Sequence, residues 1–267
     1  MATSFDPQTY WEKRLTQHFN LKGVGDIGLP ESYNHFLYKI RSHVFRRSLR
    51  STNLDITTAN VLDIGSGVGF YIAEWMNAGA SSVHGCDITN VVVEKLTSQY
   101  PSADFSQIDI GDQETCLPES SFDAISCLDV LFHITDDKRF ESAIQNIAKC
   151  LKPNGVFIYS DNLVEKGFRY DHQVGRTKQE IIETLGNNGL SIARSFPMFI
   201  LTNDPSKSKS LIHRKFFSML YRTLNRFPQF GAAIGSALYP IELLMLHCTS
   251  YAPSTELLIC KKTDSFD

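Results

Sequence analysis

Three glycines at alternate positions, Gly65, Gly67 and Gly69, follow an apolar run that contains Asp63 ("NVLDIGSGVGF", residues 60–70). Because glycine has no Cβ atom, the backbone there can turn tightly and approach a bound molecule closely. In open α/β sheets, ligands bind beyond the carboxyl ends of the strands, at the edge where the first strand-to-helix turn lies. The residue types and their spacing therefore predict a ligand-binding turn.

The next apolar run, "SVHGCD" (82–87), ends in Asp87, which is placed to hydrogen-bond the hydroxyls of a ribose. The glycine spacing departs from the dinucleotide pattern GxGxxG, because the third glycine comes one residue early and position 70 is Phe70. The carboxylate of Asp63 would be unfavourable beside a pyrophosphate and favourable beside a cation. The pattern thus predicts a cationic nucleoside such as S-adenosylmethionine, and it disfavours an NAD-dependent oxidoreductase.

With these motifs the sequence resembles the class I S-adenosylmethionine-dependent methyltransferases, in the small-molecule branch that includes methyltransferase type 11 and ubiquinone-methyltransferase-like proteins. The resemblance covers residues 55–165, through "VLDIGSGVG", "GCDIT", "IDIGD", "FDAISCLDVLFHI" and "LKPNGVFIYSD". It implies S-adenosylmethionine as the cofactor. The cofactor contacts that it implies are Asp63, Gly65, Ser66, Gly67, Gly69, Asp87, Ile88, Asp109, Ile110 and Leu128.

Within that set, the resemblance places Asp63 and Gly65 at the methionine part of the cofactor. It places Asp109 at the edge and Ile110 at the face of the adenine, and the backbone of Leu128 near the sulfonium. For Asp109 a plainer alternative is a solvated carboxylate that ends a strand, because "DIGD" is also ordinary loop chemistry.

Methyl transfer is an in-line displacement, for which a protein supplies alignment, a dry site and, for a hydroxyl acceptor, a base. His133 ("DVLFHIT") is expected near the transferred methyl, and His172 ("FRYDHQVGRT") where the substrate side opens. Both are candidate bases; the alternatives are an imidazole that holds its loop and a solvated segment. Further candidate substrate contacts are Tyr10, Trp11, Tyr33, Asn162, Arg169 and Tyr170. For the aromatic pair among them, a packing role at a helix start is the alternative.

Alternating strand and helix patterns position these residues. Strands are expected over 60–64, 82–87, 103–109, 122–128, 155–161, 190–199 and 254–262, with helices between most of them. Such repeated units predict an α/β fold, Rossmann-like and doubly wound, with a mostly parallel seven-stranded sheet. The expected organisation is an N-terminal helical cap (1–54), a cofactor-binding core (55–204), a helical insertion or substrate lid (205–250), and the final strand with a tail (251–267).

The composition argues against several classes of protein. A net charge of −3 gives no basic footprint for nucleic acid. One local cluster, Arg41, Arg46, Arg47 and Arg50, is interpreted as a solvated helix face, with an anionic ligand as the alternative. The six cysteines show no zinc spacing and the histidines are scattered, so no metal site is expected. The start of the chain lacks a signal-peptide pattern, which favours the cytoplasm.

The segment "FGAAIGSALYPIELLMLHC" (230–248) is close to the minimum length of a membrane span, but Pro240 interrupts it and Glu242 lies inside it. It is therefore interpreted as part of a buried or lid helix pair, with an interfacial membrane contact left open. The apolar insertion could roof a pocket for a bulky acceptor, pack on the sheet, or form a dimer contact. Monomer and homodimer both remain open.

Taken together, these residues predict methyl transfer from S-adenosylmethionine to a hydroxyl or amine of a small, bulky and partly hydrophobic molecule. Secondary metabolites, lipid or quinone precursors and sugars all fit, and oxygen is preferred because of the two histidines. The main alternative is a non-catalytic S-adenosylmethionine-binding protein. Nucleic acid is not an expected partner, since the chain is acidic and carries no NPPY-type motif.

Overall fold

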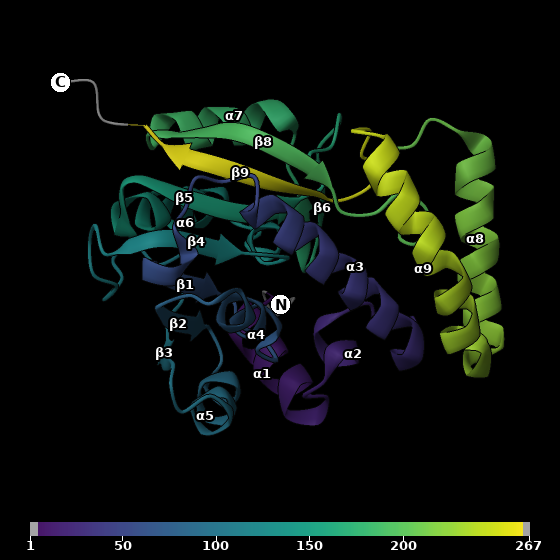
Figure 1. Ribbon diagram of the computed structural model, residues 1–267, viewed down its shortest axis with the longest axis horizontal. Coiled ribbons are helices and arrows are strands. Elements are labelled where there is room, and N and C mark those ends of the chain that lie inside the picture. Colours follow the sequence, from purple (N-terminus) through teal and green to yellow (C-terminus); the bar gives the residue numbers. More distant parts are fainter. Residues whose placement is uncertain (1–4, 264–267) are drawn as a thin grey trace.

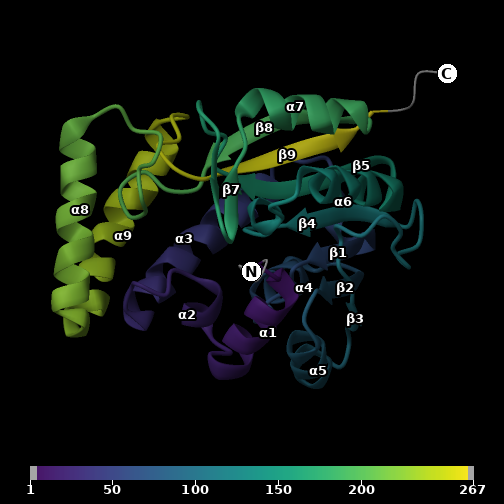
Figure 2. The ribbon, with the colours of Figure 1, turned by 180° about the vertical axis from the view of Figure 1, so that it is seen from behind.

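The computed structural model describes residues 5–263, which form a seven-stranded sheet with helices on both faces (Figures 1 and 2). The strands of the sheet are β1 (Asn60–Ile64), β2 (Ser82–Asp87), β3 (Asp104–Gln107), β4 (Phe122–Cys127), β5 (Leu151–Asp161), β8 (Leu190–Pro197) and β9 (Glu256–Lys262). Their order is β3-β2-β1-β4-β5-β9-β8, and β9 runs antiparallel to both of its neighbours. The predicted doubly wound, mostly parallel seven-stranded sheet is confirmed.

The helices divide between the two faces of this sheet. They are α1 (Pro7–Gln17), α2 (Leu21–Val24), α3 (Glu31–Leu49), α4 (Phe70–Ala78), α5 (Asn90–Gln99), α6 (Asp137–Cys150), α7 (Lys178–Asn187), α8 (Leu211–Arg226) and α9 (Gly231–Cys248). Side chains of α3, α4 and α9 share one apolar cluster, and those of α6 and α7 share the other. The central strands are mostly apolar because both of their faces are covered.

Two local differences from the sequence-based expectation concern β5 and the segment after it. β5 already begins at Leu151, before the expected start at residue 155, and "KPNG" forms an irregularity within it, where Asn154 has φ +61° and the register with β4 shifts. A short hairpin of β6 (Phe168–Tyr170) and β7 (Gln173–Gly175) follows, which the sequence did not predict. Its three-residue strands are too short to show a hydrophobic period. Short 3₁₀ turns cover Ile56–Thr58, Leu131–His133 and Pro228–Phe230.

The basic cluster of α3 is packed only in part: Arg46 and Arg50 are exposed, as a solvated helix face predicts, whereas Arg41 and Arg47 are not. Arg41 forms an ion pair with Asp129, and its side chain is only 12% exposed. Arg46 binds Glu74 through two hydrogen bonds, and Arg47 donates to a backbone carbonyl of α9. The physical reason is the position of α3 between the sheet and α9, which gives its cations carboxylate and carbonyl partners.

The insertion forms two helices, α8 and α9, at one edge of the molecule (Figures 1 and 2). The predicted interruption at Pro240 is wrong, because α9 runs through this residue. The buried carboxylate of Glu242 accepts the backbone N–H groups of Ile200, Leu201 and Thr202, which ties α9 to the segment after β8. Within residues 5–263, the helical stretch Pro228–Cys248 is the one that is long and apolar enough to cross a membrane by length and composition.

Candidate active site

A cavity of about 570 Å³ opens at the carboxyl ends of β1, β2 and β4. Its walls are the glycine turn after β1, the segments after β2 and β3, residues 128–136 after β4, and the start of α1. Tyr38 of α3 also reaches it. The sheet order reverses at β1 and β4, so the cavity lies at the topological switch point where such folds bind ligands.

The glycine turn owes its shape to left-handed backbone angles. Gly65, Gly67 and Gly69 have φ values of +71°, +53° and +80°, which residues other than glycine rarely adopt. Gly65 and Gly67 line the cavity, and a Cβ on Gly65 would come within 2.3 Å of Val130. A Cβ on Gly69 would instead lie 2.8 Å from Leu96 of α5. Gly69 thus serves helix packing and does not line the cavity.

Asp87 ends β2 and is 6% exposed. Its carboxylate accepts from Gly67 N–H at 3.0 Å, from Thr89 N–H at 3.0 Å and from the Thr89 hydroxyl at 2.8 Å. Burial raises the pKa of this carboxyl, and the same hydrogen bonds oppose the increase. A carboxylate offers about four lone-pair sites. Asp87 therefore holds the glycine turn in place. About one lone-pair site of its carboxylate remains free to accept a ligand hydroxyl.

Asp63 lies in β1, immediately before the turn, and is 1% exposed. The Ser126 hydroxyl donates to Oδ1 at 2.6 Å, and Trp75 Nε1 donates in turn to that hydroxyl oxygen at 2.9 Å. Oδ2 finds no hydrogen-bond partner in the described part of the chain. Burial raises the pKa of Asp63 to about 7. Asp63 thus lies behind the cavity wall, formed there by Ile64 and Gly65.

The adenine end predicted from the sequence contains an ion pair. Asp109, Ile110 and Ile88 all line the cavity. Asp109 accepts from Arg139 Nη2 at 2.5 Å and from Gly111 N–H at 2.9 Å. Its carboxylate is thus not the free acceptor that the resemblance implied, and a ligand amine would share it with Arg139.

His133, in the 3₁₀ turn after β4, lines the cavity. Its Nδ1 lies 2.8 Å from the backbone carbonyl of His172, which can only accept, so Nδ1 carries the proton and Nε2 keeps its lone pair. The Trp11 ring packs edge-on at 5.0 Å. Burial lowers the pKa of His133 to about 4. The imidazole is therefore neutral at physiological pH and able to accept a proton.

His172 lies in the hairpin turn between β6 and β7, and it does not line the cavity. Its exposed ring stacks 6.2 Å from Tyr10, while its backbone oxygen orients His133. Trp11 does line the cavity. The structure therefore brings His133, His172, Tyr10 and Trp11 into one aromatic cluster beside the cavity.

The remaining predicted substrate contacts lie outside the cavity. The Tyr33 hydroxyl donates to the Thr202 carbonyl at 2.9 Å in the interior. Asn162 accepts from Thr255 at 3.0 Å. Arg169 forms an ion pair with a helix-start carboxylate of α6. Tyr170 is 66% exposed on β6. Each of these side chains has a protein partner or faces solvent, which is why none reaches the ligand space.

Asp129 is a site residue that the sequence interpretation passed over. It lies directly after Leu128, lines the cavity and has φ +61°, which costs free energy in any residue other than glycine. Ser160 holds it in this conformation, since its hydroxyl donates to Oδ1 at 2.9 Å and accepts Asp129 N–H at 2.7 Å. Arg41 pairs with the other oxygen. A polar residue directly after a buried strand was the available signal.

The charged side chains of the cavity wall are almost all acidic. Among the described residues, Arg139 is the one Lys or Arg that lines it, against the carboxylates of Asp6, Asp87, Asp109, Asp112, Asp129 and Asp136. Such a surface favours a cationic ligand and opposes a pyrophosphate. Among residues 5–263, no three His, Cys, Asp or Glu side chains come together as metal ligands.

Fold and site together define an α/β protein with an acidic cavity at the switch point of its sheet. Residues 62–159 match the methyltransferase domain family. Ubiquinone biosynthesis O-methyltransferase from Histophilus somni is 33% identical over 112 residues, which cover 39% of this chain and 45% of that protein. The tRNA N(3)-cytidine methyltransferase METTL2 from Bos taurus is 34% identical over 113 residues, 39% of this chain and 30% of that protein.

The solved structure of magnesium protoporphyrin IX methyltransferase from Synechocystis PCC 6803 with bound S-adenosylmethionine shares the fold. The match has a TM-score of 0.58 and 16% identity, and it covers 98% of this chain and all of that one. By contrast, the chain spans less than half the length of the two curated relatives above.

Residues 62–159 therefore form a domain of the S-adenosylmethionine-dependent methyltransferase type, for which S-adenosylmethionine is the cofactor. The cavity fits this group. Gly65 and Gly67 leave room for close approach, Asp87 keeps an acceptor for a ribose hydroxyl, and the buried Asp63 lacks a partner for one oxygen.

Proposed function

We propose that this protein transfers the methyl group of S-adenosylmethionine to a hydroxyl or amine of a small, bulky and partly hydrophobic molecule. The observation that carries the proposal is the acidic cavity at the switch point of the sheet, with a neutral imidazole in its wall. When bound, the cofactor supplies a methyl group on a sulfonium, which a nucleophile displaces in line.

In this proposal Asp87 binds the ribose, and the glycine turn lets the backbone approach the cofactor. The neutral His133 accepts the proton of the acceptor at Nε2, since the His172 carbonyl holds its Nδ1–H. His172 is thus a positioning residue that acts through its backbone. The preference for an oxygen acceptor rests on His133, because an amine that binds in its neutral form needs no base.

An RNA acceptor is the second candidate, since one relative named above is a tRNA N(3)-cytidine methyltransferase. Two features of this chain favour the small molecule. The net charge is −3, whereas RNA-binding surfaces are basic. The walls of the cavity are also acidic and would repel a phosphate backbone. Unmodified tRNA therefore belongs in the acceptor screen beside small hydroxyl and amine compounds.

The first test is calorimetric titration with S-adenosylhomocysteine, with NADH as the control ligand. A hydrogen bond to a charged group contributes about 1.5–3 kcal/mol, so Asp87→Ala should weaken binding about 10- to 150-fold. Asp87→Asn is the matched variant: it keeps one acceptor oxygen and should lose less affinity. Thermal melts of both variants separate lost binding from lost folding, because Asp87 also holds Gly67 and Thr89.

The second step is a labelled-methyl transfer screen with the wild-type protein. Transfer to a small acceptor, with none to tRNA, is the expected result. Binding of S-adenosylhomocysteine without transfer to any acceptor would favour the non-catalytic alternative. Binding of NADH alone would overturn the cofactor role of the glycine turn in this protein.

A further inference from the structure

Helices α8 and α9 expose an uncommon amount of apolar surface. Ile212 is 82% exposed, Leu244 65%, Leu211 64% and Met219 62%. Phe227 and Phe230, at the turn between the helices, are also exposed. Both views of the molecule place these helices at one edge, with α9 beside α3 and α8 outermost (Figures 1 and 2). Large contiguous apolar surfaces of this kind mark interaction sites.

The solvent-facing side of α9 carries no Lys, Arg, Asp or Glu along its whole length. The exposed residues recur with the helical period and form one stripe: Ala232, Ala233, Ser236, Ala237, Pro240, Ile241, Leu244, His247 and Cys248. The one carboxylate of the helix, Glu242, is buried and bonded to the segment after β8. Because the Glu242 side of α9 is bound to the rest of the protein, only the opposite side is available to a partner. The helix can therefore lie parallel to an apolar surface, but it cannot span a membrane.

The exposed side of α8 is basic as well as apolar. Residues 205–250 contain six Lys or Arg and the single carboxylate of Glu242, although the whole chain has a net charge of −3. Arg214, Lys215, Arg222 and Arg226 make no ion pair within residues 5–263. This apolar edge thus carries a local excess of positive charge, although the whole chain is acidic.

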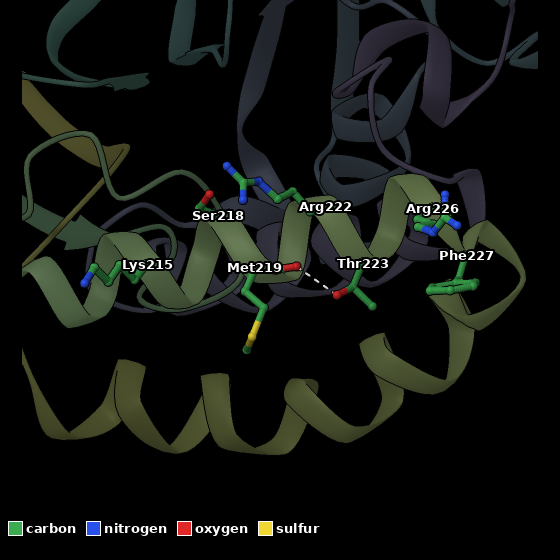
Figure 3. Close-up of a pocket in the computed structure, with 7 residues that line it drawn as sticks. All are labelled: Lys215, Ser218, Met219, Arg222, Thr223, Arg226 and Phe227. Atoms are coloured by element: carbon green, nitrogen blue, oxygen red, sulfur yellow. Dashed lines mark hydrogen bonds between the residues drawn. The ribbon is translucent and has the colours of Figure 1, made fainter.

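A shallow hollow of about 420 Å³ lies on α8, where basic and apolar side chains lie next to each other. Figure 3 shows the residues that line it: Lys215, Ser218, Met219, Arg222, Thr223, Arg226 and Phe227. Met219 points toward α9, whereas Arg222 points to the opposite side of α8. Three cations, Lys215, Arg222 and Arg226, thus line the same hollow as the apolar side chains of Met219 and Phe227.

We propose that the α8–α9 face docks on the surface of an anionic lipid bilayer. The stripe of α9 and the apolar residues of α8 would enter the acyl boundary, while the four free cations meet lipid phosphates. A second copy of the chain fits less well, because a two-fold contact would bring like charges together. RNA would match the cations but leave the uncharged stripe of α9 without a partner. The proposal is independent of the reaction that the cavity performs.

The test is flotation of the full-length protein with vesicles of phosphatidylcholine, with and without phosphatidylglycerol as roughly one lipid in three. We expect binding to the anionic vesicles and little to the neutral ones. Each Lys or Arg near an anionic surface contributes about fivefold, so Arg222→Gln with Arg226→Gln should weaken binding about 25-fold. Ile241→Ser with Leu244→Ser should weaken it about 10-fold or more.

The matched control is Lys138→Gln with Lys149→Gln, which removes the same charge from exposed positions on α6, on the other face of the sheet. It should bind vesicles like the wild type, and all three double variants should retain the wild-type melting temperature. Equal binding to neutral and anionic vesicles, or unchanged binding by both α8–α9 variants, would overturn the proposal. So would absence of vesicle binding together with a dimer in light scattering that Ile241→Ser with Leu244→Ser dissociates.

Discussion

At the scale of single residues, Asp63 connects the buried core to the ligand site. Its pKa of about 7 in the ligand-free protein results from burial. A bound cation nearby favours the carboxylate and lowers this pKa, so ligand binding near pH 6.5 should release a proton, and affinity should rise with pH until about pH 8. Calorimetry of S-adenosylhomocysteine in two buffers of different ionisation enthalpy measures this release.

Two controls define the Asp63 prediction. Adenosine has no ammonium group and should release no proton, and Asp63→Asn should abolish the release by S-adenosylhomocysteine. An identical proton release from the Asp63→Asn variant would assign the titrating group elsewhere.

His133 gives the second prediction at this scale. If it accepts a proton from a hydroxyl, His133→Ala should lower kcat about 10²- to 10⁴-fold. Because its pKa is about 4, the neutral form predominates above about pH 5, and this group should leave kcat/KM flat between pH 6 and 8. His172→Ala is the control, since it removes the ring but keeps the carbonyl that accepts from Nδ1. Equal losses in both variants would contradict the separate roles.

At the scale of secondary structure, the link between α9 and the segment after β8 depends on Glu242. Glu242→Ala leaves three backbone N–H groups without their acceptor, and each buried unpaired group costs about 1–3 kcal/mol. We expect the free energy of unfolding to fall by about 3 kcal/mol or more in urea titrations. Glu242→Gln keeps one acceptor oxygen and should cost less. A loss below about 0.5 kcal/mol for the alanine variant would mean that packing on α3 alone holds the helix.

The same scale shows which elements the sequence could specify. The core strands were predictable because both of their faces are buried and their residues are mostly apolar. The start of α1 also has a local signal, because an Asp directly before a Pro ("FDP", residues 5–7) favours a helix N-terminus, and Asp6 accepts from Thr9 N–H at 2.9 Å. The β6–β7 hairpin was not, because three residues are too few for a period. The interruption predicted at Pro240 was wrong because a proline lowers only the local helix propensity, whereas the hydrogen bonds between Glu242 and the segment after β8 support α9.

At the scale of the whole molecule, Arg41 connects the N-terminal helices to the site. Its guanidinium pairs with Asp129 and lies 5.0 Å from the Phe199 ring, so it bridges α3, the end of β4 and the segment after β8. Removing one partner of a largely buried ion pair leaves the other charge without a counterion. Arg41→Ala should therefore lower the free energy of unfolding by about 3 kcal/mol. The double variant with Asp129→Ala should recover part of that loss. Strict additivity in chemical denaturation would show that the two side chains do not stabilise each other.

The part of the site that the sequence specified most directly is the one whose residues lie close together in the chain. The glycine turn and Asp87 belong to one strand–helix–strand unit, so their spacing carries the information. By contrast, the partners of Asp129 come from Arg41 and Ser160, which are remote in sequence and become neighbours only in the folded sheet. The true environment of the basic cluster on α3 was hidden for the same reason.

The position of β9 has a consequence for synthesis on the ribosome. This strand lies between β5 and β8 and pairs with both, but it follows the whole α8–α9 insertion in the chain. Until residue 262 has left the exit tunnel, β5 and β8 each present an unpaired edge that can join another nascent chain. The ligand cavity is built from segments up to residue 139, so it can form before the sheet closes. Cofactor bound at that stage would stabilise the incomplete domain before the antiparallel strand β9 is added.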